Sequence, residues 1–220
     1  MRRYLQGTLD FACGIYAVIN ALSCLRGLDL AGARRVFQET QISLASRPGL
    51  WARFSRNETD HYWLVRYMLQ RWCLEPPYRL HFFQPFSDCL LPGPQALDLD
   101  RASMFLPEAR QPDGPPSFEK TRSEAEASWK EVCSWFLDER EEKSRKAAIL
   151  RFHRFIPGVV QPVVSHWTTV RAANTDCLYL HDASAEQGAL YTLEHKVLLP
   201  DQQRRAPVRI VPESILLLQG

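Results

Sequence analysis

The chain is organised around residues 6–22, which read QGTLDFACGIYAVINAL. The first five residues combine polar side chains with a glycine, as turns do. Apolar residues then recur at the i, i+3, i+4 and i+7 spacing that marks one buried face of a helix. These residues are Ile15, Val18, Ile19 and Leu22. The pattern predicts a helix that begins at Cys13, continues to residue 26 and ends near Gly27.

Cys13 stands where the turn gives way to this helix. A thiol at a helix N-terminus meets the positive end of the helix dipole and unpaired backbone N–H groups. Both stabilise the thiolate, which is the reactive form of cysteine. Gln6 lies just upstream and offers a side-chain N–H to an oxyanion. The position favours a nucleophile; the alternative is a small apolar side chain buried on an ordinary helix.

A second group of polar residues occurs late in the chain. Residues 163–171 and 177–182 are rich in β-branched and aromatic types and flank a short turn at Asn174, which predicts an antiparallel hairpin. His166 lies eight residues before Asn174, and Asp182 lies eight residues after it. In a hairpin centred there without a bulge, their Cβ atoms are opposed at about 5 Å. The carboxylate then orients the imidazole and favours its protonated form.

The remaining histidines have no comparable setting in the sequence. His181 is expected to point to the opposite face of a regular strand, so His166 is the expected functional imidazole. Surface or structural roles are expected for the others, which are His61, His81, His153 and His195. A simpler alternative makes His166 a cross-strand neighbour of Trp167 and Asp182 the start of the following turn.

These residues resemble a known family. They are similar to the papain-like cysteine peptidase superfamily, which has a Cys-Gly pair at a helix start, a Gln upstream, a late His and an acidic or amide residue at the end of the next strand. Here these residues are Cys13-Gly14, Gln6, His166 and Asp182. The closest similarity is to its peptidase C39-like group, and it covers residues 4–25 and 163–185. The resemblance implies particular roles for four residues. They are Cys13 as nucleophile, His166 as general base, Asp182 as the residue that orients His166, and Gln6 in the oxyanion hole.

We therefore expect an α+β, papain-like fold in one domain over residues 1–220. An N-terminal helical lobe would carry Cys13 and pack on a C-terminal antiparallel sheet that carries His166 and Asp182. Further expected elements follow from local patterns. They are a helix from Asp29, a loop over 43–57, a helix from 59 or 60 to 73, a strand over 78–83, a Pro-rich excursion over 84–117, a charged helical segment over 118–150, and strands within 188–193 and 208–218.

Composition narrows the class of protein. The 220 residues carry a net charge of +2, which argues against binding to nucleic acid or to an acidic membrane surface. Six cysteines are scattered without the spacing of zinc sites, so no metal is expected. The sequence has neither a P-loop nor a dinucleotide-type glycine pattern, so no organic cofactor is expected. No apolar run reaches the length of a membrane span, and no signal peptide is evident. These features predict a cytoplasmic protein with free thiols.

The sequence thus predicts a thiol hydrolase, a cysteine peptidase that cleaves an amide bond in a protein or peptide through an acyl-enzyme. Cys13, His166 and Asp182 would form its catalytic triad. Two alternatives remain open at this stage. The same triad supports acyl transfer of the transglutaminase type or deamidation. A non-enzymatic alternative is a protein-binding module whose partner meets residues 84–150.

Overall fold

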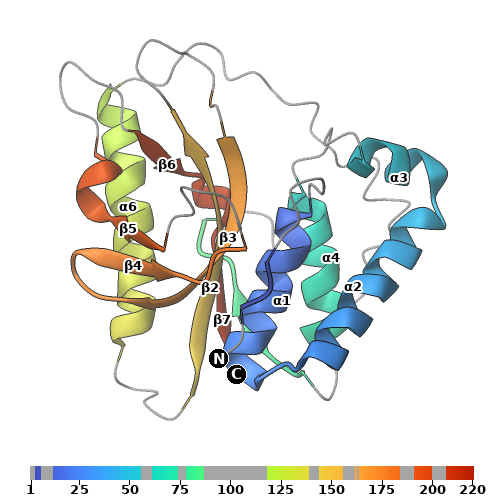
Figure 1. Ribbon diagram of the computed structural model, residues 1–220. Helices are drawn as coiled ribbons and strands as arrows, with labels where there is room; N and C mark the ends of the chain where they lie inside the picture. The colour runs from blue at the N-terminus through green and yellow to red at the C-terminus, as the bar shows by residue number, and fades with distance from the viewer. Residues whose placement is uncertain are drawn as a thin grey trace.

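The protein has a mixed α+β architecture (Figure 1). The computed structural model describes residues 3–5, 12–55, 61–73, 78–86, 118–138, 144–155, 162, 164–183, 191–199 and 207–220. These parts of the chain contain five α-helices and a seven-stranded antiparallel sheet. The expected α+β class is confirmed.

Helices come first in the chain. One short strand and one long helix follow, and the remaining strands come after that helix. The helices are α1 (Cys13–Arg26), α2 (Leu30–Ala45), α3 (Pro48–Ser55), α4 (Tyr62–Cys73) and α6 (Phe118–Leu137). The strands are β1 (His81–Phe83), β2 (Lys146–Arg154), β3 (Val164–Ala173), β4 (Cys177–Leu180), β5 (Thr192–Glu194), β6 (Val208–Ile210) and β7 (Leu216–Gln219). The strand order is β1-β7-β2-β3-β4-β5, and β6 pairs with one end of β2.

Helix α1 begins and ends where the sequence predicts. Gly27 terminates it in the left-handed conformation at φ 69°, and its N–H donates to the carbonyl of Ser23. Asp29 then caps α2 by accepting a hydrogen bond from the Gly32 N–H at 2.7 Å. Eleven of the fourteen α1 residues are buried, because the helix lies between the sheet and helices α2 and α4 (Figure 1).

The sheet separates two apolar cores. Helix α6 covers one face, whereas α1 and the other N-terminal helices cover the opposite face (Figure 1). Strand β2 alternates between them: Ala147 and Ile149 join the α1 side, and Ala148 and Leu150 join the α6 side. All four side chains are fully buried. Strand β2 is therefore the central strand of a three-layer arrangement.

Two of the expected segments are wrong. The helix expected over 118–150 ends at Leu137, and residues from Lys146 onward form β2. A strand covered on both faces lacks the apolar–polar alternation that identifies a half-buried strand, so the sequence pattern did not reveal the start of β2. The loop expected over 43–57 also contains α3, which starts at Pro48, because proline is well suited to the first turn of a helix.

Other features of the chain are described only in part. Of the Pro-rich segment expected over 84–117, residues 84–86 are described and the remainder lie outside the described residues. Cys13, Cys24, Cys133 and Cys177 are free thiols. In the described ranges, no helix is both long and apolar enough to span a membrane.

We expect Ile149→Ala and Leu150→Ala each to lower the free energy of unfolding by about 2–5 kcal/mol, since each leaves a cavity in a different core. Leu137→Ala is the matched control: Leu137 is half exposed at the end of α6, so its loss should cost about 0.5 kcal/mol or less. Urea denaturation measures all three variants. A large cost for only one of the two β2 variants would contradict a strand buried on both faces.

Candidate active site

Cys13 is the first residue of α1. Its neighbour Ala12 provides no side-chain cap, and the Ala12 carbonyl accepts the first helical hydrogen bond from Tyr16 at 3.0 Å. The thiol is half-buried. It therefore meets the positive end of the helix dipole.

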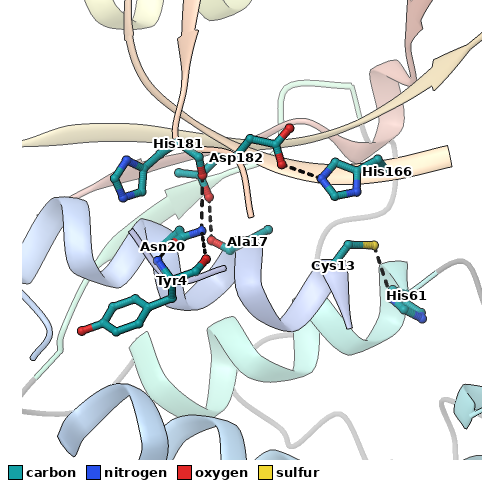
Figure 2. A network of polar contacts seen from close by, with 9 residues as sticks. Tyr4, Cys13, Ala17, Asn20, His61, His166, His181 and Asp182 are labelled. Atoms are coloured by element: carbon teal, nitrogen blue, oxygen red, sulfur yellow. Dashed lines mark hydrogen bonds and ion pairs between the residues drawn. The ribbon is translucent and has the colours of Figure 1, made fainter. Parts of the chain in front are cut away.

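His166 and Asp182 form an ion pair beside this helix end (Figure 2). The Nε2 atom of His166 lies 2.7 Å from Oδ1 of Asp182. The Asp182 side chain is 1% exposed and that of His166 is 13% exposed, so water screens their interaction weakly. Because Nε2 is held by the carboxylate, Nδ1 is the ring nitrogen that remains for the thiol.

The pair forms through a register different from the one expected. A bulge lies between Val170 and Ala172, and Val170 pairs with Leu180, the last residue of β4. Extending that pair by two residues on each strand places Asp182 level with residue 168, not with His166. Direct opposition is therefore wrong, and the contact is diagonal. Diagonal neighbours on one face remain within reach of long side chains, which explains why the pair still forms.

Two buried hydrogen-bond connections dock α1 beside this pair. The Thr169 hydroxyl of β3 donates to the Ala17 carbonyl of α1 at 2.7 Å. The fully buried Asn20 donates to the carbonyls of His181 and Tyr4 at 3.3 and 3.1 Å, and accepts from the Tyr4 N–H at 2.8 Å. The His181 carbonyl directly precedes Asp182 in the chain. The helix that carries the thiol is thus attached both to the strand of His166 and to the segment of Asp182.

The electrostatics of the thiol differ from those of the other buried cysteines. Burial by itself raises the pKa of Cys13, but hydrogen bonds and electrostatic interactions with His166 and His61 outweigh it and lower the pKa to about 6. Burial without such partners raises the pKa of Cys24 to about 12 and that of Cys133 to about 11. At neutral pH, Cys13 is a thiolate whereas Cys24 and Cys133 are thiols.

The imidazole shows the complementary shift. Burial by itself lowers the pKa of His166, but the hydrogen bond and negative charge of Asp182, followed by those of Cys13, raise the pKa to about 10. The thiolate and the imidazolium therefore coexist between about pH 6 and about pH 10. Such a pair is the resting form of an activated cysteine nucleophile.

A residue that sequence reasoning missed lies on the other side of the thiol. His61 Nδ1 is 3.9 Å from Cys13 Sγ, and the residue is 2% exposed, so a surface position for His61 is wrong (Figure 2). Helix α4 brings it there by packing on α1. Gly14 is the residue in the sequence that could have indicated this close approach. A Cβ at position 14 would lie 3.0 Å from the His61 Cβ, so only glycine fits without a shift.

The other candidate residues lie elsewhere. Gln6, expected in the oxyanion hole, lies outside the described residues. The ring of His181 points away from the thiol, as expected (Figure 2). His81 lies in β1, His153 in β2, and His195 stacks on Trp129 at 4.7 Å between ring centres. In the ranges that the structure describes, no group of three or more metal-binding side chains occurs.

Comparison with protein-family models, curated proteins and solved structures found no match for this chain. The chemistry of Cys13, His166, Asp182 and His61 is therefore the basis for a functional conclusion.

We expect Cys13 to be alkylated by iodoacetamide with a pH midpoint near 6, because the thiolate is the reacting species. Cys177 is the matched control, since it is also free and half-buried. Peptide mass spectrometry at several pH values measures both. His166→Ala should move the Cys13 midpoint upward. A Cys13 that reacts no faster than Cys177 at pH values near 6 would contradict the lowered pKa.

We expect Thr169→Val and Thr40→Val each to lower the free energy of unfolding by about 1–3 kcal/mol, because each removes one buried hydroxyl hydrogen bond. The Thr40 hydroxyl bonds within α2, to Val36, whereas that of Thr169 joins β3 to α1. Only Thr169→Val should therefore raise the alkylation midpoint of Cys13. Equal midpoints in the two variants would show that the Thr169 bond does not set the geometry of the thiol.

Proposed function

We propose that this protein is a thiol hydrolase of the papain-like type, a cysteine peptidase that cleaves an amide bond in a peptide or protein. The observation that carries the proposal is the position of the Cys13 thiol at the start of α1, beside a His166 imidazole that the buried Asp182 carboxylate holds. Interaction with His166 and His61 lowers the pKa of this thiol to about 6. The residues, the chain order and the roles agree with the resemblance to the peptidase C39-like group.

The first step is acylation. The Cys13 thiolate attacks the substrate carbonyl, and the new C–S bond places negative charge on the carbonyl oxygen. The backbone N–H of Cys13, at the start of α1, is suited to stabilise that oxyanion, and the proposal assigns the side chain of Gln6 as its second donor. The oxyanion then collapses to re-form the carbonyl, the C–N bond breaks, and the His166 imidazolium gives its proton to the departing amine nitrogen. A thioester on Cys13 and a free amine result.

The second step is hydrolysis. His166, now neutral, accepts a proton from water as the water oxygen attacks the thioester carbonyl. Collapse of the intermediate breaks the C–S bond, releases a carboxylic acid and restores the thiolate–imidazolium pair. Throughout both steps Asp182 keeps His166 in the orientation that presents Nδ1 to the sulfur. Acyl transfer to an amine would share the first step. In the second step the amine, in place of water, would attack the thioester.

We expect wild-type protein to release nitrophenol from p-nitrophenyl acetate and to carry an acetyl group on Cys13 in intact-protein mass spectra. The same protein should cleave members of a mixed fluorogenic peptide-amide library. Cys13→Ala should abolish all three signals while leaving the thermal midpoint nearly unchanged. His166→Ala should slow peptide cleavage by about 10²–10⁴-fold, and Asp182→Asn should slow it less.

The peptide-cleavage rate should rise as pH passes about 6, where the thiolate forms, and fall as pH approaches about 10, where His166 loses its proton. Adding an amine acceptor distinguishes transfer from hydrolysis by the mass of the product. A protein whose Cys13 is alkylated rapidly but forms no acyl-enzyme with either the ester or the library would contradict the proposed hydrolase.

A further inference from the structure

The Cys13 thiol lies between two imidazoles, although the proposed mechanism uses only one of them. His166 approaches from the sheet, and His61, directly before α4, approaches from the helical side (Figure 2). His166 has a carboxylate partner and moves protons. His61 touches the sulfur itself, at 3.9 Å, and the mechanism so far gives it no role.

The position of His61 is tightly constrained. Its ring stacks on that of Phe54 with centres 5.2 Å apart, and its Cβ packs against Gly14. Its carbonyl accepts the Val65 N–H at 2.9 Å and so starts α4. Its φ angle is +58°, the only positive value at a non-glycine residue in the described part of the chain. Such a conformation is uncommon for a side-chain-bearing residue and is found disproportionately at functional sites.

The hydrogen-bonding of the ring indicates which nitrogen carries the proton. Nε2 of His61 is buried and has no hydrogen-bond partner among the described residues. A proton on Nε2 would leave a buried donor unsatisfied, which costs free energy. A proton on Nδ1 instead faces the Cys13 sulfur, where it forms a charge-assisted hydrogen bond with the thiolate. The surroundings therefore favour the Nδ1–H tautomer.

We propose that His61 is a second, permanent hydrogen-bond donor to the Cys13 sulfur, which it holds as a thiolate independently of His166; the catalytic importance of this role rests on the proposed thiol hydrolase. The proton on His61 does not move during the reaction. It stabilises the attacking sulfur before acylation and the departing sulfur when the thioester breaks. At that second point the newly protonated His166 faces the departing sulfur from the sheet, and His61 donates to it from the helical side.

Two substitutions separate this role from a structural one. His61→Gly and His61→Asn both tolerate the left-handed backbone and both lose the ring that stacks on Phe54. Asparagine keeps an N–H donor near the position of Nδ1, whereas glycine keeps none. Among the described residues, the titratable groups that face the thiol are His61 and His166, with Asp182 behind the latter. The pH midpoint of Cys13 alkylation measures the donor directly and needs no substrate.

We expect His61→Gly to raise that midpoint by about one pH unit, the shift that corresponds to loss of one hydrogen bond to a charged group. His61→Asn should stay closer to the wild-type value. His61→Gly combined with His166→Ala should raise the midpoint beyond either single variant. An unchanged midpoint in folded His61→Gly, or equal midpoints in the glycine and asparagine variants, would overturn the proposal.

If both variants fail to fold, the wild-type protein still provides a test. Ring-nitrogen NMR of isotope-labelled histidine should show the Nδ1–H tautomer of His61 and a change at Nδ1 when Cys13 is alkylated. The Nε2–H tautomer would overturn the proposal. A His61-dependent midpoint in a protein that forms no acyl-enzyme would refute the hydrolase alone, whereas an active hydrolase without that dependence would refute the role of His61 alone.

Discussion

The site depends on how α1 is attached to the sheet. Helix N-termini and strand ends are both common features of proteins. For a reactive thiol, the helix N-terminus that carries the cysteine must lie close to the strand that carries the histidine. Here the Thr169 hydroxyl fixes α1 to β3, and Asn20 fixes it to the backbone just before Asp182. Both bonds are buried, where an unsatisfied partner is costly, so they specify one docking position rather than a range of positions. The apolar contacts of α1 provide stability, and these polar contacts provide the geometry.

The same burial creates an electrostatic problem that the site has to overcome. Removing water from Cys13 and His166 opposes charge on both, and at Cys24 and Cys133 burial is the largest influence and raises the pKa values. At Cys13 the pKa is lowered instead, because each charge faces an opposite one. The Asp182 carboxylate faces the His166 imidazolium, which in turn faces the Cys13 thiolate. In a weakly screened interior these interactions are stronger than in water. His61 adds a donor from the opposite side, which is why we assign it to the thiolate rather than to proton transfer.

The sequence predicted the features that local chemistry determines. Helix α1, its glycine terminus and the Asp29 cap depend on residues within one turn of each other, and the Cys13, His166 and Asp182 set followed from hairpin spacing and family resemblance. The features that the sequence did not predict depend on tertiary context. Strand β2 is apolar on both faces because layers on both sides cover it, the bulge in β3 leaves no mark in composition, and His61 reaches the thiol only because α4 packs on α1. The glycine at position 14 was the one local sign that something approaches closely there.

The central claim is that Cys13 and His166 rest as a thiolate–imidazolium pair. Ring-nitrogen NMR of isotope-labelled histidine, at a pH between about 6 and about 10, tests it without any substrate. The account predicts that both nitrogens of His166 carry protons in the wild-type protein throughout that range. In Cys13→Ala the His166 pKa should be lower, because the thiolate that helps to raise it is absent. A neutral His166 with a single protonated nitrogen at neutral pH in the wild-type protein would contradict the account.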